Sequence, residues 1–232
     1  MKRCPLKPVL AILLSALALP VVAAPLQFSI TELGVFTPTG INNQGQVSGW
    51  TNGFDGQAAV LWNGSAVTPI APLSGSSFAY GVNDAGKVVG SYGDQQSRAF
   101  SYAANTVDSI APGGSSALAV NNAGQIAGSV EADGSTHAYI YSNNKLNDIN
   151  SGASGSGSIA NALSNNGHVT GVRWDSDLSE RHAFIYANGT TTDLSSVVQG
   201  YSTGTGINDK GQVIMTVDAG DPNARKSYMY AN

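Results

Sequence analysis

An alternation of apolar and polar residues, interrupted by a short polar turn, recurs five times along this chain. Residues 81–90, GVNDAGKVVG, are the clearest copy, with apolar positions on both sides of the turn. The fourth turn residue is always glycine, at Gly45, Gly86, Gly124, Gly167 and Gly211. Alternation on both sides of a turn is typical of a β-hairpin. Each copy therefore predicts two antiparallel strands.

The composition of the turn predicts its backbone. The first turn residues are Asn42, Asn83, Asn121, Ser164 and Asn208. A side-chain oxygen at the first position and glycine at the fourth are typical of a type I turn closed by a residue with positive φ. We expect each of these side chains to cap its own turn. The alternative is a ring of amides that binds a ligand.

Two further strands complete each repeat. A short aromatic strand follows a variable loop, in residues 59–62, 99–102, 138–141, 183–186 and 227–230. A tight turn, Asn-Gly or Asn-Asn in three copies, then leads into a fourth strand. Four strands in about 41 residues match the size of a propeller blade. The chain is therefore predicted to be all-β, a five-bladed β-propeller; the alternative is an open solenoid of β-hairpins.

The two ends of the chain are predicted to complete one blade together. The last repeat stops after its third strand, and residues 27–33 supply an orphan strand that ends in Glu32-Leu33, like the other fourth strands. Pairing of the two would close the ring and remove the exposed sheet edges of an open array. An open solenoid would not need such complementary ends. We expect a single propeller domain over residues 25–232.

The first 24 residues are predicted to be a secretory signal peptide. A basic start is followed by an apolar run, residues 8–19, and by small residues up to Ala24, as in export signals. The alternative is a membrane anchor, for which the apolar run is short. The only cysteine, Cys4, would leave with this segment. We therefore expect a secreted or periplasmic protein without disulfides.

The net charge limits the classes of partner. The chain holds 15 acidic residues against 11 basic ones, and three of the basic ones lie in the predicted signal peptide. The mature chain would therefore carry a net charge of −7. Such a chain offers no basic surface to nucleic acid or to an anionic membrane. No cofactor is expected.

A resemblance to a known family rests on the aromatic strands. His182, Ala183 and Phe184, with the hairpins around them, resemble the HAF repeat family, an extracellular repeat of bacteria. Residues 137–139 (HAY) and 98–100 (RAF) are near matches, and the likeness covers nearly all of residues 27–232. The resemblance implies export and a repeat array. It implies no defined activity, so no functional residue is carried over.

The candidate binding residues lie on the loops that vary between repeats. Alternating strand directions put these loops on one face and the short turns on the other, and function usually resides in variable loops. The candidates for binding a glycan or a partner protein are Trp174, Asp175, Asp177, Arg98, His137 and His182. Trp174 could stack on a sugar ring. The alternatives are packing over a blade edge for Trp174 and a solvated surface for the charged residues.

Metal binding is not expected. Asp175, Asp177 and Glu180 could gather a calcium ion, but their loop lacks the glycine and the ligand spacing of a known calcium loop. His137 and His182 occupy equivalent positions on neighbouring blades, which are too far apart for the two side chains to share a zinc ion.

The enzyme alternative is a propeller-type glycoside hydrolase. Its carboxylates would have to reach the substrate near the axis. We expect the strand that leads into each turn to lie nearest the axis. These five strands contain no Asp, Glu, His, Lys or Arg, and they are residues 36–42, 77–83, 115–121, 158–164 and 202–208. One Gly-x-Ser-x-Gly match, residues 200–204, leads into a strand, and no histidine follows it, unlike a hydrolase nucleophile motif. We therefore predict a non-enzymatic binding module.

Overall fold

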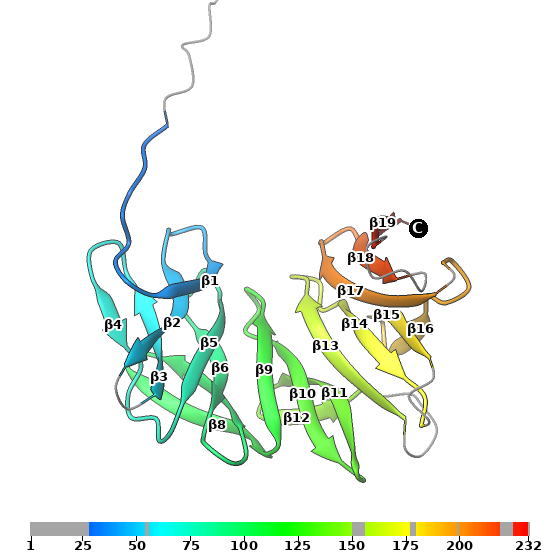
Figure 1. Cartoon of the computed structure of the whole chain (residues 1–232), viewed down its shortest axis with the longest axis horizontal. Coiled ribbons are helices and arrows are strands. Elements are labelled where there is room, and N and C mark those ends of the chain that lie inside the picture. The colour runs from blue at the N-terminus through cyan, green and yellow to red at the C-terminus, as the bar shows by residue number, and fades with distance from the viewer. Residues whose placement is uncertain are drawn as a thin grey trace, which may run out of the picture. The chain divides into compact units, whose positions relative to one another are not determined.

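The computed structural model describes residues 28–53, 56–149, 156–176, 180–198, 200–218 and 225–231. Within these residues the regular structure consists of 19 β-strands in five sheets (Figure 1). The chain divides at residue 33 into two units, and every strand belongs to the second, Leu33–Asn232. The predicted all-β class is therefore confirmed.

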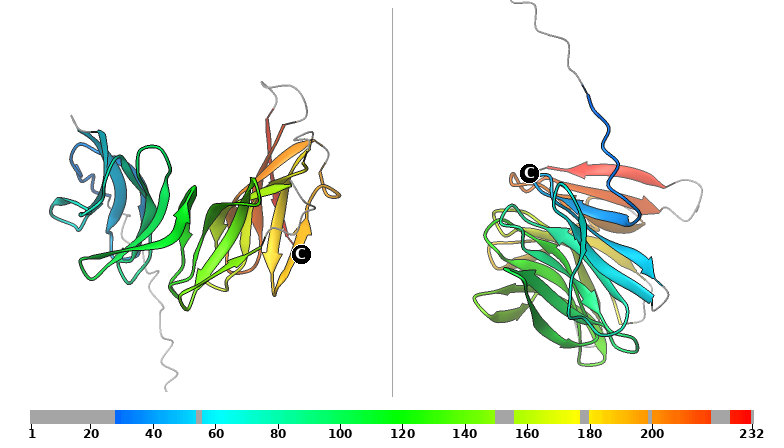
Figure 2. Two further views of the ribbon diagram at one scale, coloured as in Figure 1. Left: turned by 90° about the horizontal axis from the view of Figure 1, so that it is seen from below. Right: turned by 90° about the vertical axis from the view of Figure 1, so that its left-hand side faces the viewer.

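Each sheet is formed by strands that are consecutive in the chain, and neighbouring strands are antiparallel (Figures 1 and 2). The first sheet contains β1 (Thr37–Ile41), β2 (Val47–Gly53), β3 (Gly56–Trp62) and β4 (Val67–Pro69). The second contains β5 (Ser77–Val82), β6 (Val88–Tyr92), β7 (Arg98–Ala103) and β8 (Thr106–Gly113). The third contains β9 (Ser115–Val120), β10 (Ile126–Ala132), β11 (Ser135–Ser142) and β12 (Lys145–Asp148). The fourth contains β13 (Gly157–Leu163), β14 (Val169–Trp174), β15 (Arg181–Ala187) and β16 (Thr190–Asp193). The fifth contains β17 (Tyr201–Ile207), β18 (Val213–Asp218) and β19 (Lys226–Tyr230).

The turn between the first two strands of every sheet has the predicted geometry. The five turn glycines have φ between 75° and 79°. The N–H of Gly86 donates to the carbonyl of Asn83 at 2.9 Å, which closes a type I turn. The Asn83 Oδ1 accepts the N–H groups of Ala85 and Lys87 at 3.1 and 2.9 Å. The expectation that these side chains cap their own turns is confirmed.

Every first strand contains a β-bulge that the sequence did not predict. One extra residue interrupts the register with the second strand in each of β1, β5, β9, β13 and β17. The extra residues are Thr39, Tyr80, Leu118, Asn161 and Thr205. A bulge reverses the side on which the following side chains point. Ala79 accordingly packs with the preceding sheet, whereas a Cβ on Gly81 would meet Leu118 and Val120 of the next one.

The core consists of four apolar clusters, and each lies between two consecutive sheets. In the first cluster, Ala59 and Ile70 of the first sheet pack against Ala79, Val88 and Phe100 of the second. The other three repeat this arrangement at the following interfaces. The second, third and fourth sheets are therefore covered on both faces. For this reason adjacent residues such as Val88 and Val89, whose side chains point to opposite faces, are both fully buried.

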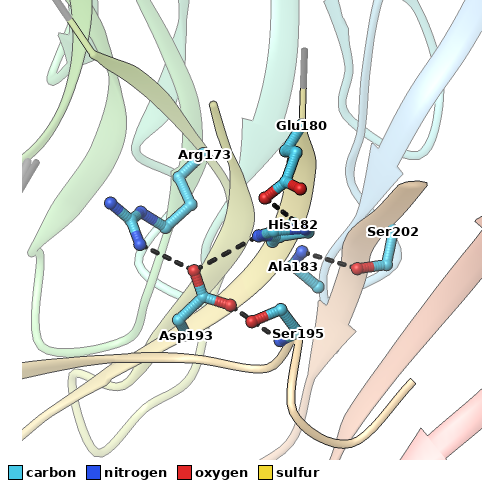
Figure 3. Close-up of polar contacts among 7 residues, drawn as sticks. All are labelled: Arg173, Glu180, His182, Ala183, Asp193, Ser195 and Ser202. Carbon is cyan, nitrogen blue, oxygen red and sulfur yellow. Dashed lines mark hydrogen bonds and ion pairs between the residues drawn. The ribbon is translucent and has the colours of Figure 1, made fainter. Parts of the chain in front are cut away.

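A serine at the start of four first strands connects consecutive sheets. The Ser77 hydroxyl accepts the N–H of Ala59 at 2.9 Å, and Ser202 accepts that of Ala183 at 2.9 Å (Figure 3). Ser115 and Ser158 make the same contact with Ala99 and Ala138. This contact explains the small residues at the start of these strands, because a buried N–H needs an acceptor.

The predicted pairing of residues 27–33 with the last sheet does not appear in the structure. Residues 28–33 carry no strand, and Phe28 and Ile30 are exposed, by 89% and 101%. The sheet β17–β18–β19 has three strands among the described residues. Closure of the ring therefore stays a prediction. The predicted signal peptide lies outside the described residues, and within these no helix is long and apolar enough to cross a membrane.

Candidate functional site

Each of the two candidate histidines contacts an aspartate on the outermost strand of its own sheet. His137 on β11 contacts Asp148 on β12, with 2.7 Å between Nδ1 and Oδ2. His182 on β15 lies 3.5 Å from the equivalent carboxylate, Asp193 on β16 (Figure 3). Each histidine thus has a carboxylate partner in the adjacent strand. The two histidines lie in different sheets, His137 in the third and His182 in the fourth.

Asp193 is the centre of the polar cluster in the fourth sheet. Its Oδ2 accepts a hydrogen bond from Arg173 Nη1 at 2.6 Å, and its Oδ1 accepts the N–H of Ser195 at 2.7 Å (Figure 3). Partial burial raises the pKa of Asp193, but the hydrogen bonds from Ser195 and Arg173 and the charge of His182 together lower it below the usual value. The cluster therefore holds an ionised carboxylate whose contacts all come from its own sheet and the segment just after it.

Trp174 covers its own sheet. It lies opposite Gly157 in the register of β13 and β14, and a Cβ on Gly157 would lie 2.4 Å from the indole. The structure thus supports the expectation that Trp174 packs over the sheet edge. Asp175 follows it on the surface, and Asp177 lies outside the described residues.

Arg98 is exposed at the start of β7, in a different sheet from the other candidates. Within the part of the chain that the structure describes, no three His, Cys, Asp or Glu side chains form a group that could hold a metal ion. The candidates in the described strands are divided among three sheets, with Arg98 in the second, His137 in the third, and Trp174 and His182 in the fourth.

An open pocket of about 570 Å³ lies beside the last sheet. It is lined by Arg181, Tyr201, Thr203, Thr216, Val217, Asp218 and Arg225. Thr203 and Thr216 face each other in the register of β17 and β18, on the face opposite to Val213 and Met215, which pack on the fourth sheet. The pocket therefore opens on the side where each of the first four sheets packs against a following sheet.

Sequence analysis missed a cluster of three aromatic side chains. Trp50, the middle residue of β2, lies edge-to-face with Phe78 of β5, with ring centres 5.4 Å apart at 71°. Phe78 is almost parallel to Tyr80, with centres 6.3 Å apart at 5°. All three are partly exposed, and the Tyr80 hydroxyl lies 3.3 Å from Ser91 Oγ. We call Trp50, Phe78 and Tyr80 the aromatic cluster.

The repeat pattern contains the signal that could have identified this cluster. At each of the three positions, the other four copies of the repeat have a smaller residue. The position of Trp50 holds Ser91, Ser129, Val172 and Thr216, and that of Phe78 holds Thr37, Ser116, Ile159 and Thr203. The position of Tyr80 holds Thr39, Leu118, Asn161 and Thr205. The third, fourth and fifth repeats therefore form the same scaffold without any of these aromatic rings.

No family model and no curated protein matches this chain. Its fold is similar to solved structures. One is the β-propeller domain of the Trilobed protease from Pyrococcus furiosus, described with an open velcro topology. It has a TM-score of 0.61 at 11% identity, covering 84% of this chain and 66% of that chain. The fold is a β-propeller.

Two TolB structures give the same result. The putative TolB from Agrobacterium tumefaciens has a TM-score of 0.51 at 14% identity, covering 66% of this chain and 62% of that one. TolB from Acinetobacter baumannii has a TM-score of 0.50 at 13% identity, covering 85% and 54%. This chain thus spans about half to two thirds of the length of these propeller structures. At such identities the likeness concerns the fold alone, and the HAF resemblance stays a prediction.

Proposed function

We propose that this protein is an exported, non-enzymatic propeller module that binds a glycan at its face of irregular loops. The observation that carries the proposal is the aromatic cluster. Trp50 lies three residues before the end of β2, and Phe78 is the second residue of β5. Phe78 is therefore close to the variable loop that precedes β5, and Trp50 contacts it from the middle of its own strand. Tyr80, the bulge residue, extends the cluster along the first strand.

The chemistry of the cluster suits a sugar. Tryptophan and tyrosine combine a large apolar ring face with one polar group, so they contact surfaces that are part apolar and part wet. A pyranose ring has such surfaces, with C–H groups on its faces and hydroxyls at its edge. Binding sites are commonly lined by aromatic side chains with a few polar groups that fix orientation. The Tyr80 hydroxyl and the Trp50 indole N–H are such groups here.

The enzyme alternative has less support than the binding module. Glycoside hydrolases use two carboxylates that flank the scissile bond. The strands that carry Phe78 and Tyr80 and their equivalents contain no Asp or Glu. Trp174 was the candidate for stacking on a sugar, but its indole lies against Gly157. The residues that would stack on the sugar are therefore those of the aromatic cluster.

A glycan array with the mature protein tests the proposal, followed by titration of the best ligand. Trp50→Ala and Phe78→Ala are each expected to weaken binding about tenfold, or about 1.4 kcal/mol. Trp174→Ala is the matched control and is expected to keep the affinity. Failure of all glycans to bind, or full affinity in both cluster variants, would contradict the proposal. Turnover of a chromogenic glycoside that one carboxylate substitution abolishes would favour the hydrolase.

A further inference from the structure

The short turns of the five sheets are joined by a directional ladder of hydrogen bonds. The N–H of the second turn residue donates to the side chain of the second turn residue in the next sheet. The steps are Asn43 to Asp84 at 2.9 Å, Asp84 to Asn122 at 3.0 Å, Asn122 to Asn165 at 3.0 Å and Asn165 to Asp209 at 2.7 Å. We call this series the turn ladder. Its four steps join all five turns in chain order.

A second series runs beside the turn ladder in the same direction. The side-chain amide of Asn42 donates to the carbonyl of Asn83 at 2.9 Å, and Asn83 and Asn121 repeat this contact with the sheets that follow. The series stops at Ser164, whose hydroxyl accepts the N–H of His168 in its own turn.

A third series involves the turn glycines. The side chain that follows each turn glycine lies over the glycine of the next turn, as Gln46 does at Gly86 and Gln125 at Gly167. Gly45, in the first turn, would meet nothing within 4 Å. Gln212 of the last sheet is the side chain in the position that would cover it.

The turn ladder and the series at the turn glycines leave complementary groups at the two ends of the array. Among the described residues, the Asp209 N–H has no acceptor, and Asn43 Oδ1 accepts no hydrogen bond. The next step of the turn ladder after Asp209 would be a bond from its N–H to Asn43. The last sheet thus carries the donor end of the pattern and the first sheet the acceptor end.

The apolar residues at the ends show the same complementarity. Ile214 and Met229, on one face of the last sheet, are 55% and 65% exposed, whereas the equivalent Val89 and Ser101 are buried. Ile41 of the first sheet is 71% exposed, whereas its equivalents Val82, Val120, Leu163 and Ile207 all pack against the cluster shared with the preceding sheet. Ile214 and Met229 of the last sheet and Ile41 of the first sheet are thus equivalent to residues that pack between sheets elsewhere in the array. Together they could form a fifth apolar cluster if the two sheets met.

We propose that the exposed face of the last sheet is the docking surface for the first sheet of the same chain, so that the array closes into a ring. The path of the chain indicates that the sheet which docks on this surface comes from the same molecule. Each fourth strand leads into the first strand of the next sheet, and residues 28–33 precede β1 with a fourth-strand pattern. Ile30 and Leu33 have the spacing of Val107 and Ile110.

Docking within one chain also costs less entropy than association of two chains. One contact of the pattern has no counterpart at the junction, because Phe36 stands where the other first strands have a serine hydroxyl. The ring therefore has one interface that opens more easily than the other four. A closed ring covers the exposed apolar face and leaves the irregular loops for ligands.

Disulfide trapping in the full chain tests the docking. Asn43→Cys/Asp209→Cys, in a Cys4→Ser background, should form an intrachain disulfide on mild oxidation, seen as loss of two hydrogens in the intact mass of a monomer. Asn122→Cys/Asn165→Cys joins neighbouring turns and is the positive control. Asn43→Cys/Asn165→Cys joins turns three sheets apart and is the negative control. A disulfide-linked dimer would show that a second copy is the occupant and would overturn the proposal, as would no disulfide where the positive control forms one.

A single substitution gives an independent readout that does not depend on forming a bond. Ile214→Cys in the same background would be covered in the closed ring, so its reaction with a maleimide should be at least tenfold slower than that of Asn188→Cys, which lies on an exposed turn. Equal rates for the two thiols in the folded protein would overturn the proposal.

Discussion

The side-chain amide of Asn83 donates a hydrogen bond of 2.9 Å to the main-chain carbonyl of Asn121, the equivalent residue of the next sheet. The same side chain caps its own turn through Oδ1. One residue therefore fixes a local turn and connects two sheets, and the contact is buried. Such a contact explains asparagine at this position in the first three turns, because serine can supply the cap but cannot reach the next sheet.

Asn83→Asp is expected to destabilise the protein, because aspartate keeps the acceptor for the turn but removes the donor and brings a charge towards the Asn121 carbonyl. Loss of a buried partner costs about 1–3 kcal/mol. Urea unfolding gives the free energy directly. Asn63→Asp is the control, because the printed contacts of the Asn63 side chain are those of Oδ1 within its own turn, which aspartate can keep. Equal losses at both positions would show that the contact between the sheets contributes nothing.

The turn glycines give a second test. Gly86→Val or Gly124→Val should lower the free energy of unfolding by about 1–3 kcal/mol, because a β-branched side chain is strained at φ of 75° and 79°. Gly53→Val is the control, since Gly53 lies at the exposed end of β2 and is not among the residues with positive φ. A change in the free energy of unfolding below about 0.3 kcal/mol at both turns would be far less than the strain expected for a β-branched residue with positive φ. It would show that valine is not strained at these positions.

Local features of the fold were predictable and distant contacts were not. The turn at Asn83 and Gly86 follows from residues within one hairpin, so the sequence predicts both its position and its backbone. The bulge at Tyr80 depends on how two faces of a strand pack against different sheets, which no local pattern specifies. Trp50 and Phe78 belong to different sheets, and only comparison of the repeats distinguishes them from ordinary strand residues. His182 was predicted as a surface ligand because its partner Asp193 lies in another strand.

The lowered pKa of Asp193 predicts a pH dependence of stability. A carboxyl whose pKa is lower in the folded state than in the unfolded state contributes stability at pH values above the unfolded pKa, about 3.9. This contribution is lost as the pH falls through the folded pKa. The melting temperature of Asp193→Asn should therefore be lower than that of the natural protein at pH 7, and the two should converge towards pH 3.

Asp133→Asn, in the exposed hairpin turn between β10 and β11, is the control for this pH dependence. It is expected to keep the natural pH profile of melting. A constant difference between Asp193→Asn and the natural protein from pH 7 to pH 3 would mean that the Asp193 side chain contributes packing rather than charge.

Strand addition by residues 27–33 is separate from docking of the sheets and has its own test. Glu32 is equivalent in sequence to Asp148 and Asp193, and Lys226 is equivalent to His137 and His182. If residues 27–33 become the fourth strand of the last sheet, Glu32 and Lys226 form an ion pair of the kind seen in the third and fourth sheets. Charge reversal at either residue should lower the melting temperature, and reversal at both should restore it.

Deletion of residues 27–33 from the mature chain gives the largest effect if this strand forms. The outer edge of β19 would lose its hydrogen-bond partners, and Phe28, Ile30 and Leu33 would leave their packing sites. Burial of three such side chains contributes roughly 5–8 kcal/mol as an upper estimate, and domains have about 5–15 kcal/mol in total. The truncated protein should therefore unfold or aggregate through its free edge.

Phe28→Asp/Ile30→Asp should reproduce the loss of stability, whereas Ser29→Asp/Thr31→Asp should not, because alternate residues of a strand point to opposite faces. A monomeric truncation that melts within a few degrees of the mature protein would show that these residues are a terminal tail.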